Sequence, residues 1–356
     1  MYEHVEEIIF LLISTAFFRL LYYFSYRPRL KSIEWSKILT NSSSKLQPHW
    51  CDNYIFYLPF IWVWTDIFLV VYLASLIDKE LFYLLAIILI SGRFRALQEI
   101  GHMAIHKTLC NSESAQFLIT NLFFQFPLFK PYAKKRRESH MRHHFYTNVA
   151  KIDPSVIEMV DAGLKKGMSY SSFIYFIFYS ITPQGIIKTI SNSLRNTFDF
   201  YYNIPLFILR IGSVSIFTLL FYYFGGVKAI ELYYLIPAFI IYPFLGWISQ
   251  LAEHRWLIET SESDKKIREC IIGRPIDYPG IRGFIIRHLI FPFGDSYHLA
   301  HSLYPKMHWL TLKDLDAKLK MRNDIPYCQF LSKGLIWPHE DGVPSAFSDL
   351  KDRIVC

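Results

Sequence analysis

Five long apolar runs constrain the fold of this chain more than any other feature of its sequence. They cover residues 8–24, 54–77, 81–92, 205–226 and 229–249. A helix that crosses a bilayer needs about 20 predominantly apolar residues, and the second, fourth and fifth runs meet that length unaided. The third run is shorter, but its helix can continue through Arg93 and Arg95 if those side chains reach the membrane interface. The sequence therefore predicts an all-α integral membrane protein.

Composition agrees with this fold class, because 52% of the residues are apolar and only 19% are charged, against about 25% charged in soluble domains. We expect about four transmembrane helices plus an N-terminal helix. That first helix follows acidic residues and precedes no small-residue cleavage site, so we expect it to be retained rather than removed as a signal peptide. Weaker runs at 117–129 and 170–182 are too short to span and are expected to lie in the interface or re-enter.

The basic residues indicate how the chain is oriented. If the helices alternate, the basic clusters all fall on one side of the membrane, at residues 27–31, 92–95, 134–137 and 254–268. The positive-inside rule then places that side in the cytoplasm, and anionic lipid accounts for the net charge of +8 without nucleic acid. We expect three parts: an N-terminal helix and linker (1–50), a membrane domain (51–312) and a polar cytoplasmic tail (313–356).

Eight of the thirteen histidines occur in clusters on the predicted cytoplasmic side. These candidate metal ligands are His102, His106, His140, His143, His144, His254, His298 and His301. Spacings of three and four residues place imidazoles on one helix face, which suits ligands of one metal or of adjacent metals. His4, His49, His288 and His339 fit ordinary structural or surface roles, and we expect His308 to flank the site. The pattern predicts a metal centre in a helical cap at the cytoplasmic mouth of the helix bundle.

Ligand type alone does not identify the metal, because imidazole suits zinc, copper, iron and nickel. Eight imidazoles are too many for one ion, so two metals with open positions and redox or hydrolytic chemistry fit better. A metal transporter would place histidines or carboxylates in mid-span, whereas these lie at the helix mouths. A non-catalytic membrane scaffold would leave the histidines without a role.

Three segments, HMAIH (102–106), HMRHH (140–144) and HLAH (298–301), resemble the histidine boxes of the membrane fatty acid desaturase and hydroxylase superfamily. The likeness extends to HHFYTN (143–148) followed by an acidic segment, to LAEHRW (251–256) and to YHLAHSLYP (297–305). It covers residues 55–312. The resemblance implies a four-helix transmembrane body with a cytosolic di-iron centre.

That resemblance also implies a function. The eight histidines would hold two irons, dioxygen would be the co-substrate, and a separate ferredoxin or cytochrome would supply electrons. The implied activity is oxygen-dependent desaturation of a fatty acyl or related lipid chain. A hydroxylase or ketolase of the same superfamily and a degenerate, non-catalytic member remain as alternatives.

We expect five nearby carboxylates to orient the imidazoles, although each of them also suits a helix cap or a solvated surface charge. They are Glu99, Glu138, Asp153, Glu253 and Asp295. Asn148 is a candidate ligand through water, or a cap.

Two positions depart from the family pattern. Ser302 stands where the family usually has a second adjacent histidine, and Gln98 stands where many members of one branch place a histidine before the glutamate. Either His106 supplies the first missing ligand in a shifted register, or the site has one ligand fewer. For the second, His254 is the favoured replacement and His308 is the reserve.

Overall fold

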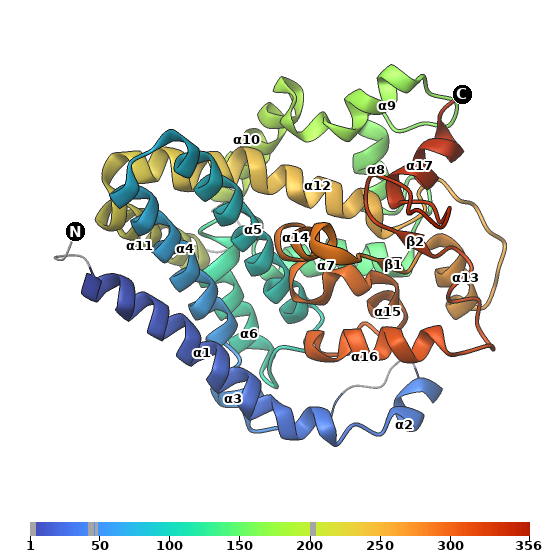
Figure 1. The fold of residues 1–356 in the computed structure, drawn as a ribbon, viewed down its shortest axis with the longest axis horizontal. Coiled ribbons are helices and arrows are strands. Elements are labelled where there is room, and N and C mark those ends of the chain that lie inside the picture. Colours follow the sequence, from blue (N-terminus) through green and yellow to red (C-terminus); the bar gives the residue numbers. More distant parts are fainter. Residues whose placement is uncertain (1–4, 42–45, 47–48, 200–203) are drawn as a thin grey trace.

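The computed structural model describes residues 5–41, 46, 49–199 and 204–356. Helices make up nearly all of its regular structure, as the sequence predicts. Only β1 (Ile276–Asp277) and β2 (Ser332–Lys333) pair as short parallel strands in the described part of the chain. In Figure 1 the long helices α1, α4, α5 and α11 lie on the left, and the shorter C-terminal helices gather on the right.

The helical elements follow one another in two halves. The first half contains α1 (Val5–Lys31), α2 (Trp35–Thr40), α3 (Cys51–Tyr54), α4 (Leu58–Ile77), α5 (Glu80–Ile105), α6 (Glu113–Thr120), the π-helix η2 (Asn121–Gln125), α7 (Ala133–Phe145), α8 (Pro154–Asp161), α9 (Tyr170–Ile177), the 3-10 turn η3 (Tyr179–Ile181) and α10 (Pro183–Thr197). The second half contains α11 (Ile204–Ala229), the π-helices η4 (Ile230–Leu235) and η5 (Pro237–Ile241), α12 (Tyr242–Glu253), α13 (Lys265–Ile272), α14 (Gly280–Leu289), the 3-10 helix η6 (Pro292–Tyr297), α15 (His298–Leu303), α16 (Trp309–Lys320) and α17 (Ala346–Ile354).

Three helical stretches of the described chain are long and apolar enough to cross a membrane: Glu6–Lys31, Leu58–Ile77 and Ile204–Glu253. The third has 50 residues and contains two of the predicted runs. Helix α5 has 26 residues, which is also long enough to span, but two arginines make it less apolar.

The 50-residue stretch folds back on itself at Gly225 and Gly226. Gly226 has φ of 67°, and a Cβ added to Gly225 would lie 2.4 Å from Ser75 Oγ, so both positions favour glycine. The rings of Phe221 and Tyr234 then stack with centroids 4.7 Å apart. Thirteen residues of straight helix would separate them by about 20 Å. The runs 205–226 and 229–249 are therefore two segments, as the sequence predicts.

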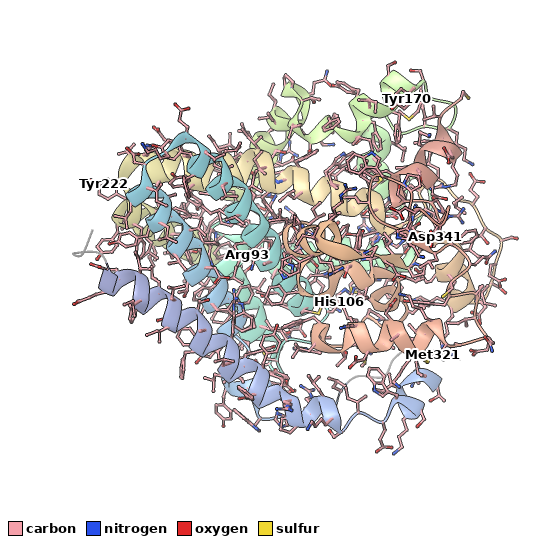
Figure 2. All side chains as sticks on the ribbon, viewed as in Figure 1. Arg93, His106, Tyr170, Tyr222, Met321 and Asp341 are labelled. Atoms are coloured by element: carbon pink, nitrogen blue, oxygen red, sulfur yellow. The ribbon has the colours of Figure 1, made fainter. Side chains whose placement is uncertain are left out.

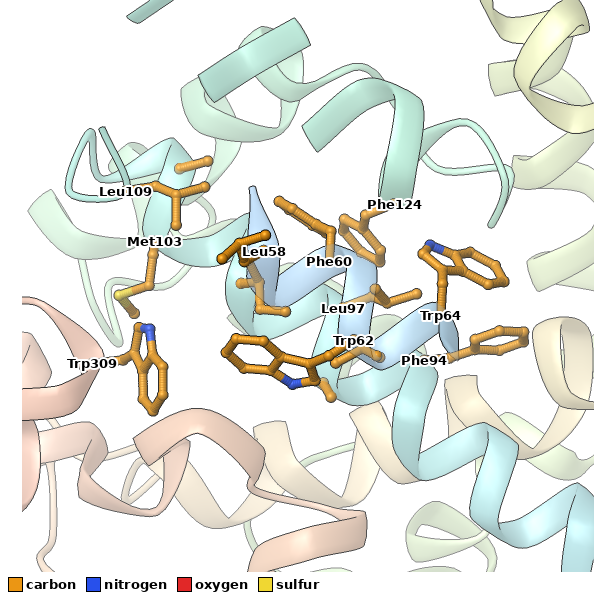
Figure 3. Close-up of a cluster of buried hydrophobic side chains, with 14 of the residues drawn as sticks. Leu58, Phe60, Trp62, Trp64, Phe94, Leu97, Met103, Leu109, Phe124 and Trp309 are labelled. Atoms are coloured by element: carbon orange, nitrogen blue, oxygen red, sulfur yellow. The ribbon is translucent and has the colours of Figure 1, made fainter. Parts of the chain in front are cut away.

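A buried aromatic core fixes α5 against α4. Figure 3 shows Phe60, Trp62 and Trp64 of α4 beside Phe94 and Leu97 of α5. The indole of Trp64 also donates to the carbonyl of residue 123 at 2.8 Å. Because all five of these side chains are almost fully buried, they hold the C-terminal end of α5, and the histidines on it, in a fixed position.

The expectation that both α5 arginines reach the membrane interface is wrong for Arg95. Its side chain is 1% exposed and contacts carboxylates on either side. Arg93 is partly buried and pairs with Asp66 of α4 at 3.5 Å, and it also donates to the carbonyl of His288 at 3.0 Å (Figure 2). An arginine that finds carboxylates inside a helix bundle has no need to extend to the interface.

The C-terminal segment packs onto the rest of the chain. Phe347, Leu350 and Ile354 of α17 join a buried cluster with Leu251 and Trp256. Contacts between α16 and η6 fix the segment that precedes α15. The predicted division of the chain at residue 312 remains a prediction.

Candidate metal centre

All eight predicted ligands lie at or near the ends of helices. His102 is in the last turn of α5 and His106 is its C-cap residue. Helix α7 carries its three histidines in its last two turns, since it ends at Phe145. His254 is the C-cap of α12, and α15 begins with His298. Helix ends meet in space here, so segments about 200 residues apart contribute to one site (Figure 2 labels His106).

Five imidazoles form the first group, which we call the five-histidine group. Its members are His102, His106, His140, His144 and His301. The Nε2 atom of His140 lies 2.8 Å from those of His102 and His106 and 3.0 Å from that of His144. His301 joins through His106 at 3.1 Å. Two nitrogen ligands held at right angles about 2.1 Å from one metal are themselves about 3 Å apart. The spacing is therefore that of a coordination shell.

The three-histidine group consists of His143, His254 and His298. Its Nε2 atoms are separated by 3.2 Å between His143 and His254, and by 3.0 Å between His298 and His254. The two groups are adjacent, because the His298 and His301 ring centroids are 5.9 Å apart and those of His140 and His143 are 6.1 Å apart. The arrangement suits two neighbouring metal ions.

The protonation states also fit metal binding. Burial lowers the pKa of His140, His144 and His301 well below its ordinary value. These imidazoles are neutral at physiological pH, which is the form that binds a metal. A neutral imidazole has one N–H, so five Nε2 atoms facing one point exceed what mutual hydrogen bonds can satisfy. A cation at that point would satisfy their lone pairs.

Two carboxylates orient ligands through the other ring nitrogen. Nδ1 of His143 lies 2.9 Å from Asp153, and Nδ1 of His102 lies 3.0 Å from Glu99. Asp153 is fully buried and also accepts from the backbone N–H groups of Asn148 and Ser155. Burial lowers the pKa of His143, but the hydrogen bond and charge of Asp153 outweigh it and raise that pKa overall. Such carboxylate–imidazole pairs fix the tautomer and direct Nε2 toward the metal.

Arg95 connects the carboxylates that surround the histidines. Its guanidinium contacts Glu99 at 3.1 Å and Asp295 at 2.8 Å. The Ser249 hydroxyl lies 2.9 Å from Asp295 and 3.0 Å from Glu253, so its one proton can be donated to either carboxylate. Four of the five predicted carboxylates are therefore beside the histidines, whereas Glu138 is exposed on α7 and contacts neither group.

The amide of Asn148 is occupied by the backbone that follows His254. Its Nδ2 donates to the carbonyl of Arg255 at 2.8 Å, and its Oδ1 accepts from the N–H of Leu257 at 3.0 Å. The residue therefore holds the segment after His254 in place, and of the two roles predicted for Asn148, its contacts support the structural one.

The two departures from the family pattern have different surroundings. Gln98 accepts from the Tyr242 hydroxyl at 2.7 Å and belongs to neither histidine group, although it lines the same cavity as His102. His102 and His106 both belong to the five-histidine group. The Oγ of Ser302 is buried and has no hydrogen-bond partner among the described residues.

The remaining histidines lie apart. His308 is outside both groups and contacts the hydroxyl of Tyr22 at 3.1 Å, so it contributes nothing in place of Ser302. His49, His288 and His339 are also outside the groups, and His4 lies outside the described residues.

Two cavities reach the histidines. One of about 400 Å³ is lined by His102 and His140 of the five-histidine group and by His143 and His298 of the three-histidine group. Another of about 490 Å³ reaches His106. The first also contains Lys130, Arg136 and Arg95, which sequence reasoning did not assign to the site. A charged residue inside an apolar run is a signal that would have identified Arg95.

Comparison with known proteins identifies the family. Residues 79–328, which include all eight histidines, match the family model for fatty acid desaturase. The chain belongs to the fatty acid desaturase family. It is also similar to the dihydrorhizobitoxine desaturase of Bradyrhizobium elkanii, with 25% identity over 350 residues that cover 91% of each protein. Membership of the fatty acid desaturase family makes this chain an oxidoreductase, and its apolar helices agree with membrane association.

Proposed function

We propose that this fatty acid desaturase family member is an oxygen-dependent di-iron desaturase that acts on a fatty acyl or related lipid chain. The observation that carries the proposal is the convergence of eight imidazoles, seven of them buried and that of His140 partly buried, into two adjacent groups. Iron is the metal that the family resemblance implies. Desaturation is favoured over hydroxylation because the family and the relative are both named as desaturases.

The proposed reaction converts a –CH₂–CH₂– unit to –CH=CH– while dioxygen is reduced to two waters. Dioxygen takes four electrons, of which two come from the substrate with its two hydrogens. The other two electrons, together with two protons, come from outside, so a separate ferredoxin- or cytochrome-type donor is required. When bound, the two irons would supply dioxygen activation and the oxidising power to remove hydrogen from an unactivated C–H bond.

The protein's own residues hold and orient that centre. Glu99 and Asp153 accept from Nδ1 of His102 and His143, which leaves each Nε2 lone pair directed at the metal position. Arg95 contacts both Glu99 and Asp295, so one guanidinium ties the carboxylate beside His102 to the segment that precedes His298. The burial of the histidines excludes bulk water from a strong oxidant.

Mass spectrometry of lipids from a host that expresses the protein tests this proposal. We expect a product two hydrogens lighter than its precursor, which disappears in His143→Ala. The control is His288→Ala, which removes an exposed histidine outside both groups. A product that gains an oxygen atom would identify a hydroxylase instead. Unchanged lipids with full metal content would overturn the proposed catalytic function.

A further inference from the structure

The 400 Å³ cavity beside the histidines is within the size range of small-molecule binding sites. Two members of each histidine group line it. The lining also includes residues of the segment before α7, of the first turn of α7, and of α10 and α12. A molecule in this cavity would therefore be next to the candidate metal centre.

Besides Arg95, which pairs with carboxylates, three cations line the cavity: Lys130, Arg136 and Lys188. Among the described residues, no carboxylate lies within salt-bridge distance of any of them. Lys130 Nζ lies 4.8 Å from the ring centroid of Tyr242, and the Arg136 guanidinium lies 5.2 Å from that of Phe124. Nη1 of Arg136 is buried without a hydrogen-bond partner. Removing cations from water without an anionic partner costs free energy, so these groups are suited to an anionic ligand.

None of the described carboxylates of the same cavity forms a direct ion pair with these cations, although Glu99 attracts Arg136 and Glu158 attracts Lys130 at longer range. Glu99 and Asp295 pair with Arg95, and Glu253 accepts from Ser249. Glu158 is exposed. Burial lowers the pKa of Lys130 to about 8, which leaves most of it protonated at neutral pH. Lys130 and Arg136 are therefore two cations of the cavity wall without a directly paired anion.

Helix α10 separates this cavity from an apolar surface. Lys188, Asn192 and Asn196 line the cavity, whereas Ile187 and Leu194 on the other face are 66% and 54% exposed. Outward apolar residues with an inward polar face are typical of a helix that lies in the membrane interface. The cavity therefore lies behind a helix whose outer face is apolar and suited to lipid, where an amphiphile with one charged end would be accommodated.

We propose that this cavity is the substrate pocket and that Lys130 and Arg136 bind an anionic group of the substrate, a carboxylate or a phosphate. This inference, which rests on the proposed desaturase function, narrows the substrate to a molecule with its anionic group close to the carbons that are oxidised. The cations position the substrate, and the histidine groups carry the chemistry described above.

Binding of short amphiphiles to the purified protein in nanodiscs of neutral lipid tests the pocket without turnover. The probes are hexanoate, hexyl phosphate and 1-hexanol, which share an alkyl chain and differ in charge. We expect at least one anion to bind about tenfold more tightly than the alcohol. The two anions also distinguish a carboxylate from a phosphate. The anion that binds more tightly, hexanoate or hexyl phosphate, identifies the anionic group that the substrate carries.

Matched variants locate the binding site. Lys130→Met and Arg136→Gln should each weaken anion binding by about tenfold and leave 1-hexanol unaffected, whereas Lys130→Arg should retain the preference. Lys134→Met is the control, since it removes an exposed lysine from the same helix as Arg136. Equal affinity for anion and alcohol in the wild type, or equal losses in Lys134→Met, would overturn the proposal.

Metal content separates this inference from the proposed function. A variant that keeps its metal but loses anion binding has a defect in the pocket, as we expect of Lys130→Met. A wild-type protein that binds the anion but forms no desaturated product would overturn the proposed function and leave the pocket intact. Thermal unfolding of each variant confirms that it is folded.

Discussion

Arg95 and Asp295 form a buried ion pair across 200 positions of the chain, with 2.8 Å between the guanidinium and a carboxylate oxygen. The same guanidinium contacts Glu99, one helical turn before His102. One cation therefore links the helix of the first histidine pair to the segment that precedes the last pair.

Replacing Arg95 with methionine should be strongly destabilising. It leaves Glu99 and Asp295 buried without their cation, which typically costs about 3–5 kcal/mol. We expect a lower unfolding temperature and a loss of bound metal, measured by thermal unfolding and metal analysis. Arg93→Met, which removes a more exposed arginine from the same helix, should have a smaller effect. Equal effects of the two variants would contradict a role for Arg95 in the centre.

The unequal sizes of the two groups predict unequal responses to ligand removal. His254→Ala leaves two imidazoles in the three-histidine group, so it should lose about one of two metal equivalents per chain. His106→Ala leaves four imidazoles in the five-histidine group and should retain more metal. Metal analysis of the purified variants measures both. Full activity after the double substitution of His140 and His298 would show that neither group is catalytic.

Ser302→Ala should change the iron content per chain and the product yield very little. The serine hydroxyl is buried without a partner, so its removal leaves no other group unsatisfied. His301→Ala removes a member of the five-histidine group and should abolish activity. Ser302→His should raise iron occupancy, because it restores the family pattern at this position. If Ser302→Ala were as damaging as His301→Ala, the serine itself would be part of the working site.

Asp153→Asn should lower metal affinity by about 10–100-fold, the usual cost of losing a carboxylate that orients a ligand. Asp153 accepts from Nδ1 of His143, and an amide at this position can present the wrong group to the ring. Competition with a chelator measures the affinity. Glu138→Gln is the control. Because Glu138 is exposed and contacts neither histidine group, we expect this substitution to leave the metal affinity unchanged.

Glu269 should make stability depend on pH. Its side chain is buried on α13, its carboxylate oxygens have no hydrogen-bond partner, and burial raises its pKa from 4.5 to about 7. Between these values the unfolded chain releases a proton that the folded chain keeps, so stability falls as pH rises from about 4.5 to about 7. The full effect above pH 7 is about 3 kcal/mol.

Glu269→Gln removes this titration. Its unfolding temperature should exceed that of the wild type by several degrees at pH 8, and should match it near pH 4.5. Comparing the two proteins at each pH cancels the contribution of the histidines. A difference of the same size at both pH values would refute the assignment to Glu269.

Local patterns account for what the sequence predicted well. Run length predicted the apolar helices, and spacings of three and four residues predicted that His140 and His144 share a helix face. The same reasoning failed for Arg95, which was expected at the membrane interface. Its side chain is buried because it pairs with Asp295, 200 residues away in the sequence, and local patterns do not reveal that partner. Lys130 and Arg136 were missed for a related reason, since a basic residue near a membrane resembles a lipid contact until a cavity is seen.

The sequence also did not divide the eight ligands into two groups. His143 and His144 are neighbours in the chain, yet they belong to different groups, because successive residues on a helix point about 100° apart. Which group each joins depends on where α5, α12 and α15 place their own histidines. That arrangement is a property of packing between helices.

Both histidine groups combine early and late parts of the chain, and this sets an order for the protein's biogenesis. A ribosome that has completed α5 and α7 has made His102, His106, His140, His143 and His144, but the three-histidine group still lacks two of its members. Neither shell closes until α15 has emerged, by which time every spanning segment has been synthesised. A complete shell is therefore available to a metal only late in maturation, and a chain truncated before His298 should enter the membrane without a complete metal site.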